Sequence, residues 1–236
     1  MNKKLGFFEI IAVAIILIIV LFVLMPICFH GNAIEQARTA TFKGKCRGIW
    51  VAIMSANNER ELLGQSPFFP GDLANQGITF PNAEAYFTYL MSDGTNTQSI
   101  TKKFDNCLVP DLRPEMIAAP GLMRANKGAP VLPQNNPWHV VNVATNFFAE
   151  TPFLVTRNVK ASAITYPTLP ELENKEKALL PIDQNLILRK RIVWMNLGGG
   201  TFDERFDKFT RPQLCPIPQP PGAPELTVLP SEDGYH

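Results

Sequence analysis

The sequence predicts an α+β fold, in which a long N-terminal helix packs on a small antiparallel β-sheet and long proline-rich loops join the elements. The first supporting observation is the placement of the 21 prolines, because only Pro26 precedes residue 67. The early segment can therefore form one long helix, whereas the rest of the chain is rich in turns. The second observation is a set of short β-branched and aromatic runs after residue 137, which are typical of strands.

The composition excludes several classes of function. Lys and Arg total 22, Asp and Glu total 21, and the net charge is +1, so the charge balance gives no indication of nucleic-acid binding. None of the cysteines Cys28, Cys46, Cys107 and Cys215 is spaced as CxxC, which argues against a structural zinc site. A Cys107–Cys215 disulfide remains open if the body lies outside the cytoplasm.

The segment Ile10–Phe29 is a predicted membrane anchor. It contains twenty uncharged residues, fifteen of them Ile, Leu, Val or Phe. Such a run favours insertion by about 5–9 kcal/mol and matches a hydrocarbon core of about 30 Å. Lys3 and Lys4 precede the run, which predicts a cytoplasmic N-terminus and a body on the other side of the membrane.

Two simpler interpretations of this segment compete. A cleaved secretory signal is one, since Gly31-Asn32-Ala33 places small residues at a suitable spacing, although the run exceeds the usual length of about 7–15 residues. A plain single-pass anchor for an external binding or surface-display domain is the other.

After the apolar run, the sequence predicts that the helix continues to about Leu63 and stops at Gly64. Spacings of three and four residues define two stripes on this part of the helix. The first stripe contains Ile34, Ala37, Thr41, Gly44, Gly48 and Val51, and the second contains Ile49, Ala52, Ile53 and Ala56. The second stripe is expected to cover the apolar face of the sheet.

Two residues make the N-terminal segment more specific than an ordinary anchor. Glu9 places a carboxylate at the edge of the apolar run, where an unpaired charge costs free energy. Pro26 removes one helical hydrogen bond and is expected to kink the helix. Together with Lys3-Lys4-Leu5-Gly6-Phe7-Phe8 and the amphipathic continuation, they resemble the prepilin family, the type IV pilins and the pseudopilins of type II secretion.

The resemblance implies a function and a set of site residues. It implies cleavage by a prepilin peptidase after Gly6, N-methylation of Phe7 as the mature N-terminus, and pairing of Glu9 with the N-terminal amine of a neighbouring subunit. It also implies a helix–helix assembly role for the segment with Pro26. The implied partners are homologous subunits, the peptidase, an inner-membrane assembly platform and the lipid bilayer.

In this chain, Glu9 lies two positions closer to the predicted cut than the acid of the family does. The spacing of seventeen residues between Glu9 and Pro26 matches the family. The implied location is the bacterial inner membrane with a periplasmic or extracellular body, or a filament after assembly. The expected function is a non-enzymatic structural subunit of a pseudopilus or pilus.

The predicted divisions are a leader at 1–6, the membrane half of the helix at 7–30, its outer half at 31–63, a head at 64–210 and a proline-rich tail at 211–236. Within the head, Asn82 is expected to cap a short helix that ends near Gly94, and one helical turn is expected near 115–118. Strands are predicted at 138–144, 153–156, 186–195 and 201–206. The tail is expected to be extended or mobile.

The sequence offers little support for catalysis or metal binding. No HExxH or GxSxG motif occurs, so no enzymatic activity is predicted. Asp203, Glu204 and Asp207 form an acidic cluster that is a weak calcium candidate; a solvated charge cluster is the favoured interpretation, and no cofactor is expected. Gly198-Gly199-Gly200 indicates a hairpin turn rather than a phosphate-binding loop.

Overall fold

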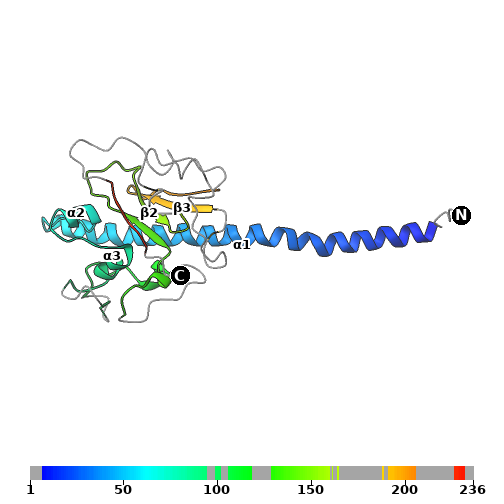
Figure 1. Cartoon of the computed structure of the whole chain (residues 1–236), viewed down its shortest axis with the longest axis horizontal. Coiled ribbons are helices and arrows are strands. Elements are labelled where there is room, and N and C mark those ends of the chain that lie inside the picture. Colours follow the sequence, from blue (N-terminus) through cyan, green and yellow to red (C-terminus); the bar gives the residue numbers. More distant parts are fainter. Residues whose placement is uncertain are drawn as a thin grey trace. The chain divides into compact units, whose positions relative to one another are not determined.

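The computed structural model describes residues 7–94, 99–101, 106–118, 129–159, 161, 164, 188, 191–205 and 226–231. Within the first helix, the side chains of residues 7–10, 12 and 20–32 are outside this description. The chain divides into two compact units, Met1–Arg38 and Thr39–His236. The first unit is helical from Phe7 onward, and the second contains the sheet (Figure 1).

The helix α1 runs from Phe7 to Leu62. It ends where the sequence predicts, because Gly64 adopts a left-handed backbone with a φ of 68° that favours glycine. Short helices follow at α2 (Pro70–Ala74), α3 (Ala83–Leu90) and α4 (Pro114–Ile117), and a 3₁₀ turn spans Pro133–Asn135. As expected, the side chain of Asn82 caps α3 by accepting a 2.8 Å hydrogen bond from the Ala85 N–H.

Five strands form one antiparallel sheet in the order β4-β3-β2-β1-β5. Their bounds are β1 Trp138–Val141, β2 Pro152–Thr156, β3 Arg191–Asn196, β4 Thr201–Arg205 and β5 Val228–Leu229. The first four lie at the four predicted strands, although β1 ends at Val141 and not at residue 144. The predicted glycine hairpin is also confirmed, since Asn196 N donates to Gly200 O and Gly199 has a φ of 83°.

The fifth strand corrects one expectation. Four strands were predicted, and the segment 211–236 was expected to be extended or mobile. Val228 and Leu229 instead pair with β1, which adds an edge strand near the end of the chain. A strand of two residues is too short to produce a period-2 pattern, so the sequence gave no signal for it.

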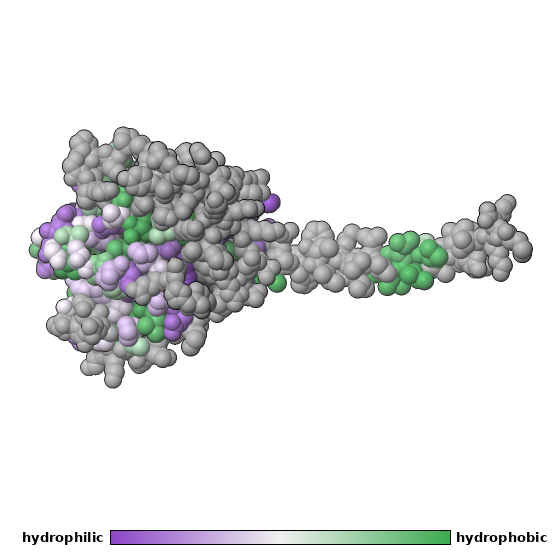
Figure 2. Space-filling view, in the orientation of Figure 1, coloured by the Kyte–Doolittle hydropathy of each residue, from purple (hydrophilic) through white to green (hydrophobic). Residues whose placement is uncertain are grey.

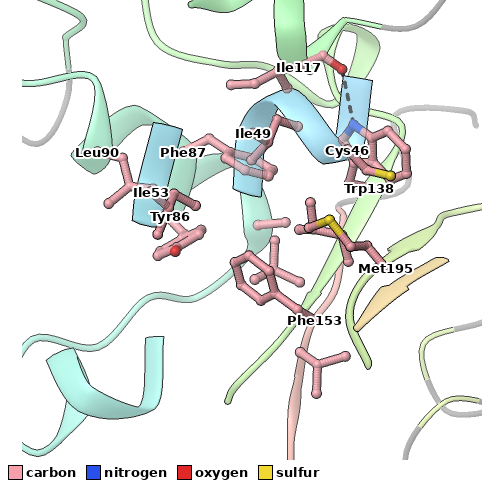
Figure 3. Close-up of a cluster of buried hydrophobic side chains, with 14 of the residues drawn as sticks. Cys46, Ile49, Ile53, Tyr86, Phe87, Leu90, Ile117, Trp138, Phe153 and Met195 are labelled. Atoms are coloured by element: carbon pink, nitrogen blue, oxygen red, sulfur yellow. Dashed lines mark hydrogen bonds between the residues drawn. The ribbon is translucent and has the colours of Figure 1, made fainter. Parts of the chain in front are cut away.

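The α+β architecture is as predicted, because the outer half of α1 packs on the sheet. Ile49 and Ile53 are fully buried, and Cys46 lies one helical turn before Ile49. Figure 3 shows these side chains among Trp138 of β1, Phe153 of β2 and Met195 of β3. Phe42 adds an edge-to-face contact with Trp138 at a centroid distance of 5.4 Å.

Polar contacts fix the position of this helix segment on the sheet. Trp50 Nε1 donates to Leu197 O at 2.8 Å, just beyond the end of β3. Lys43 and Arg191 both pair with Asp203 of β4, the first at 2.8 Å. These contacts join α1 to the β3–β4 hairpin through residues about 150 positions apart, so they hold the helix in one register against the sheet.

Candidate assembly surface

The described apolar residues near the start of α1 are exposed on every side of the helix. Exposed fractions run from 40% at Ile11 to 60% at Ile16, and the consecutive residues 15–19 are all exposed. Successive residues turn by about 100°, so five in a row cover the whole circumference. Figure 2 shows this part of the helix as a continuous hydrophobic band. A helix that is apolar all round requires lipid or other helices as surroundings.

Within the described part of the chain, no helix has a long enough apolar stretch to cross a membrane. The predicted anchor Ile10–Phe29 extends into residues 20–32, whose side chains are outside that part. The predicted processing and assembly residues Gly6, Phe7, Glu9 and Pro26 also lie outside the described residues or have side chains that do.

In the second unit, the two predicted stripes of α1 have opposite environments. The second stripe, from Ile49 to Ala56, is buried under the sheet with exposed fractions of 6% or less. In the first stripe, Thr41, Gly44 and Val51 are exposed, and Gly48 is half-buried. In the first unit, Ile34 and Ala37 of the same stripe are exposed too.

The exposed stripe of the second unit has unusually little side-chain volume. A Cβ atom placed on Gly44 would meet no atom within 4 Å, and one on Gly48 would meet only the Met116 sulfur, at 3.9 Å. Nothing within the described chain therefore requires glycine at these two helical positions, where it destabilises the helix by about 0.5–1 kcal/mol each relative to alanine. Small residues on a helix surface allow a second helix to approach closely.

A groove of about 500 Å³ adjoins this stripe. Gly48, Val51, Ala52 and Met116 are its apolar lining residues, and Arg47, Asp111 and Arg113 are its charged ones. Asp111 and Met116 belong to the segment around α4, so tertiary packing creates the groove. The stripe could be found from helical spacing in the sequence, whereas the groove beside it could not.

The two described members of the acidic cluster around β4, Asp203 and Glu204, are not arranged together as a cation site. Asp203 is occupied by Lys43 and Arg191, and Glu204 is the next residue of the same strand, so its side chain points to the opposite face. Asp207 lies outside the described residues. Within the described ranges, no group of three His, Cys, Asp or Glu side chains is arranged to hold a metal ion.

Cys46 and Cys107, the cysteines whose side chains the structure describes, are both buried. Burial raises the pKa of the Cys46 thiol to about 12, so the thiol is protonated and unreactive at neutral pH. Cys107 Sγ donates to Met91 O at 3.0 Å. Cys215 lies outside the described residues, so the Cys107–Cys215 disulfide stays a prediction.

Four phenylalanines outside α1 differ in their exposure. Phe68, Phe69 and Phe147 are 6% exposed or less and belong to the core. Phe148 is 45% exposed. The exposed surface that is most distinctive is therefore that of α1 and not an aromatic patch.

Comparison with protein-family models, with curated proteins and with solved structures finds no match to this chain.

Proposed function

We propose that the protein is a pilin-like or pseudopilin structural subunit that assembles through α1 into a filament or pseudopilus. The observation that carries this proposal is the environment of α1. Its isoleucine-rich start is exposed all round, and in the second unit one stripe is buried under the sheet while another, built from small residues, is exposed. Bundled copies of the helix would cover both exposed regions.

The resemblance of the N-terminal sequence supplies the chemistry of assembly. Cleavage after Gly6 would create a free amine on Phe7, and Glu9 would place a carboxylate nearby in the apolar layer. Each charge alone is costly there, and pairing between copies removes much of that cost. The same pairing would account for the Glu9 carboxylate at the edge of the apolar run.

The test removes the carboxylate of Glu9 in cells that contain a prepilin peptidase. Glu9→Ala should still fractionate with membranes, because Ile10–Phe29 is unchanged, but should lose crosslinks between copies and filaments. Glu59→Ala is the matched control, since it removes an exposed carboxylate from the distal part of the same helix.

Two further outcomes separate this proposal from a plain anchored domain. A mature mass that lacks residues 1–6 supports assembly, and an intact N-terminus supports the anchor. Normal assembly of Glu9→Ala would contradict the role given to this residue and would favour the single-pass binding or display domain.

A further inference from the structure

A short segment near the end of the chain, Leu226–Ser231, closes one edge of the sheet and is called the strap below. Its strand β5 pairs antiparallel with β1, with Val228 opposite Val141. Asn142 N donates to Thr227 O at 2.8 Å, and Ala83 N donates to Pro230 O at 3.0 Å. The strap therefore lies between the edge of β1 and the start of α3, and this position is called the strap site below.

A buried polar cluster holds the end of the strap. Ser231 N donates to His139 Nδ1 at 2.9 Å, and Ser231 Oγ donates to Glu84 Oε1. The other ring nitrogen of His139 is 2.8 Å from Val159 O, which can only accept, so the imidazole is neutral with its proton on Nε2. Asn136 Nδ2 donates to the same Glu84 oxygen at 2.9 Å. The cluster is specific for the backbone and hydroxyl of one residue at one position.

Apart from this cluster, the hold on the strap is shallow. Leu226, Val228 and Leu229 are only partly buried, and Thr227 is exposed. Ser231 is the one residue of the strap that is fully buried, at 4% exposure. A protein hydrogen bond contributes about 1 kcal/mol net, so the strap can leave the strap site at a lower cost than opening the core.

The chain between the sheet and the strap is longer than this connection needs. Twenty residues, 206–225, link the end of β4 to Leu226, and a chain of that length can reach about 70 Å. The strap lies four strand positions from β4, which is about 19 Å, and a return along one strand adds about 17 Å. Six of the twenty residues are proline, a composition that favours a long reach, so a linker of this length can serve its own sheet or that of an adjacent copy.

We infer that the strap site, formed by the edge of β1 and the start of α3, is an interface that accepts the strap of a second copy of this chain. The same backbone pairs and the same Ser231 cluster form whichever copy donates the strap, so the exchange loses no contact. The balance then depends on the local concentration of straps, which is high between packed copies. This inference rests on the proposed function for that packing.

The experiment follows a disulfide between two differently tagged full-length chains that are co-expressed. One chain carries Val141→Cys and the other Val228→Cys, in a background of Cys28→Ser and Cys215→Ser. These positions face each other across β1 and β5. Mild oxidation of assembled membranes should give a heterodimer that carries both tags on a non-reducing gel.

The matched control uses β1 and its other neighbour. Val140→Cys on one chain and Leu154→Cys on the other are also facing positions, but β1 and β2 are joined within the core and are not expected to exchange. Heterodimer at the level of this control would mean accidental collision and would overturn the inference.

A single chain with both Val141→Cys and Val228→Cys completes the test. If it closes the bond only within itself while the mixed pair gives no heterodimer, the strap stays with its own chain. If neither closes, the pairing of the strap is wrong. Crosslinking of Gly44→Cys between copies reports the packing of α1 separately, so strap exchange and the proposed function can fail independently.

Discussion

The two faces of α1 in the second unit differ in side-chain size and in environment. The inward face carries Ile49 and Ile53, both fully buried, whereas the outward face carries Gly44 and Val51, both exposed. The inward residues are large because they fill the space over the sheet of their own chain. Gly44 and the half-buried Gly48 beside it have no side chain, although nothing in the described part of the chain requires glycine there. The inward face therefore specifies the fold, and under the proposed function the outward face would meet a neighbouring copy.

The largest expected effect comes from placing a charge on the inward face. Ile53→Asp should lower the free energy of unfolding by about 3–5 kcal/mol, because an unpaired carboxylate replaces a fully buried side chain. Urea unfolding of the full chain, followed by tryptophan fluorescence, measures the change. Val51→Asp is the matched control, since Val51 is 52% exposed, and it should change stability by less than about 1 kcal/mol. Equal losses in both variants would contradict the assignment of the two faces.

A second test concerns Gly71, which lies against backbone atoms, whereas Gly44 faces open space. A Cβ on Gly71 would lie 2.9 Å from Val143 O and 3.0 Å from the Ala144 Cβ, and the Gly71 N–H also donates to Val143 O. Gly71→Ala should therefore cost about 1–3 kcal/mol, because backbone atoms must move apart. The same urea assay measures it. An unchanged unfolding midpoint would mean that this approach of α2 to the chain after β1 is looser than the structure shows.

Much of the fold was predictable because it depends on local patterns. The end of α1 follows from Gly64, the cap of α3 from Asn82, and the β3–β4 turn from the three glycines at 198–200. The choice of stripe for the sheet was also predictable, since Ile49 and Ile53 bring the larger apolar surface. In each of these elements, the residues that determine the structure lie within one or two turns of one another.

The missed features depend on contacts between distant residues. β5 forms only because β1 offers an edge and because His139 and Glu84 bind Ser231. In the acidic cluster at β4, Asp203 forms an ion pair with Lys43, which lies 160 positions away in the sequence. Sequence spacing carries no record of such pairs. The candidate surface on α1 was therefore predictable as a stripe, whereas its groove and the strap were not.

The pH dependence of stability sharpens the comparison at a third residue of the inward face. Burial raises the pKa of Cys46 from 9.0 to about 12, so ionisation favours the unfolded chain. The contribution of the thiol is fully present below pH 9 and is lost as the pH rises towards 12. At pH 10, the wild type should have lost about 1.4 kcal/mol more than Cys46→Ala, each relative to its own value at pH 8.

Tyr86 and Tyr89, whose pKa values are raised by burial, titrate alike in both proteins, so the difference isolates Cys46. Val51→Cys provides the outward counterpart. Its thiol should alkylate readily in the native protein, while Cys46 should react only after unfolding, as peptide mass mapping can show. Rapid alkylation of Cys46 would contradict its burial.

Substitutions of Gly44 should change stability least of all the variants above, but they should change assembly strongly. Gly44→Ala should raise the free energy of unfolding by about 0.5–1 kcal/mol, because alanine is the better helix former and its Cβ would meet no atom. Gly44→Leu should fold as well as the wild type for the same reason. In a bundle, however, leucine would hold a neighbouring helix away from a position where glycine permits contact. Crosslinks between copies should therefore persist in Gly44→Ala at a reduced level and be lost in Gly44→Leu. If Gly44→Leu assembles normally, the outward face is plain solvent-exposed surface, and the reason for its small residues must lie in the monomer.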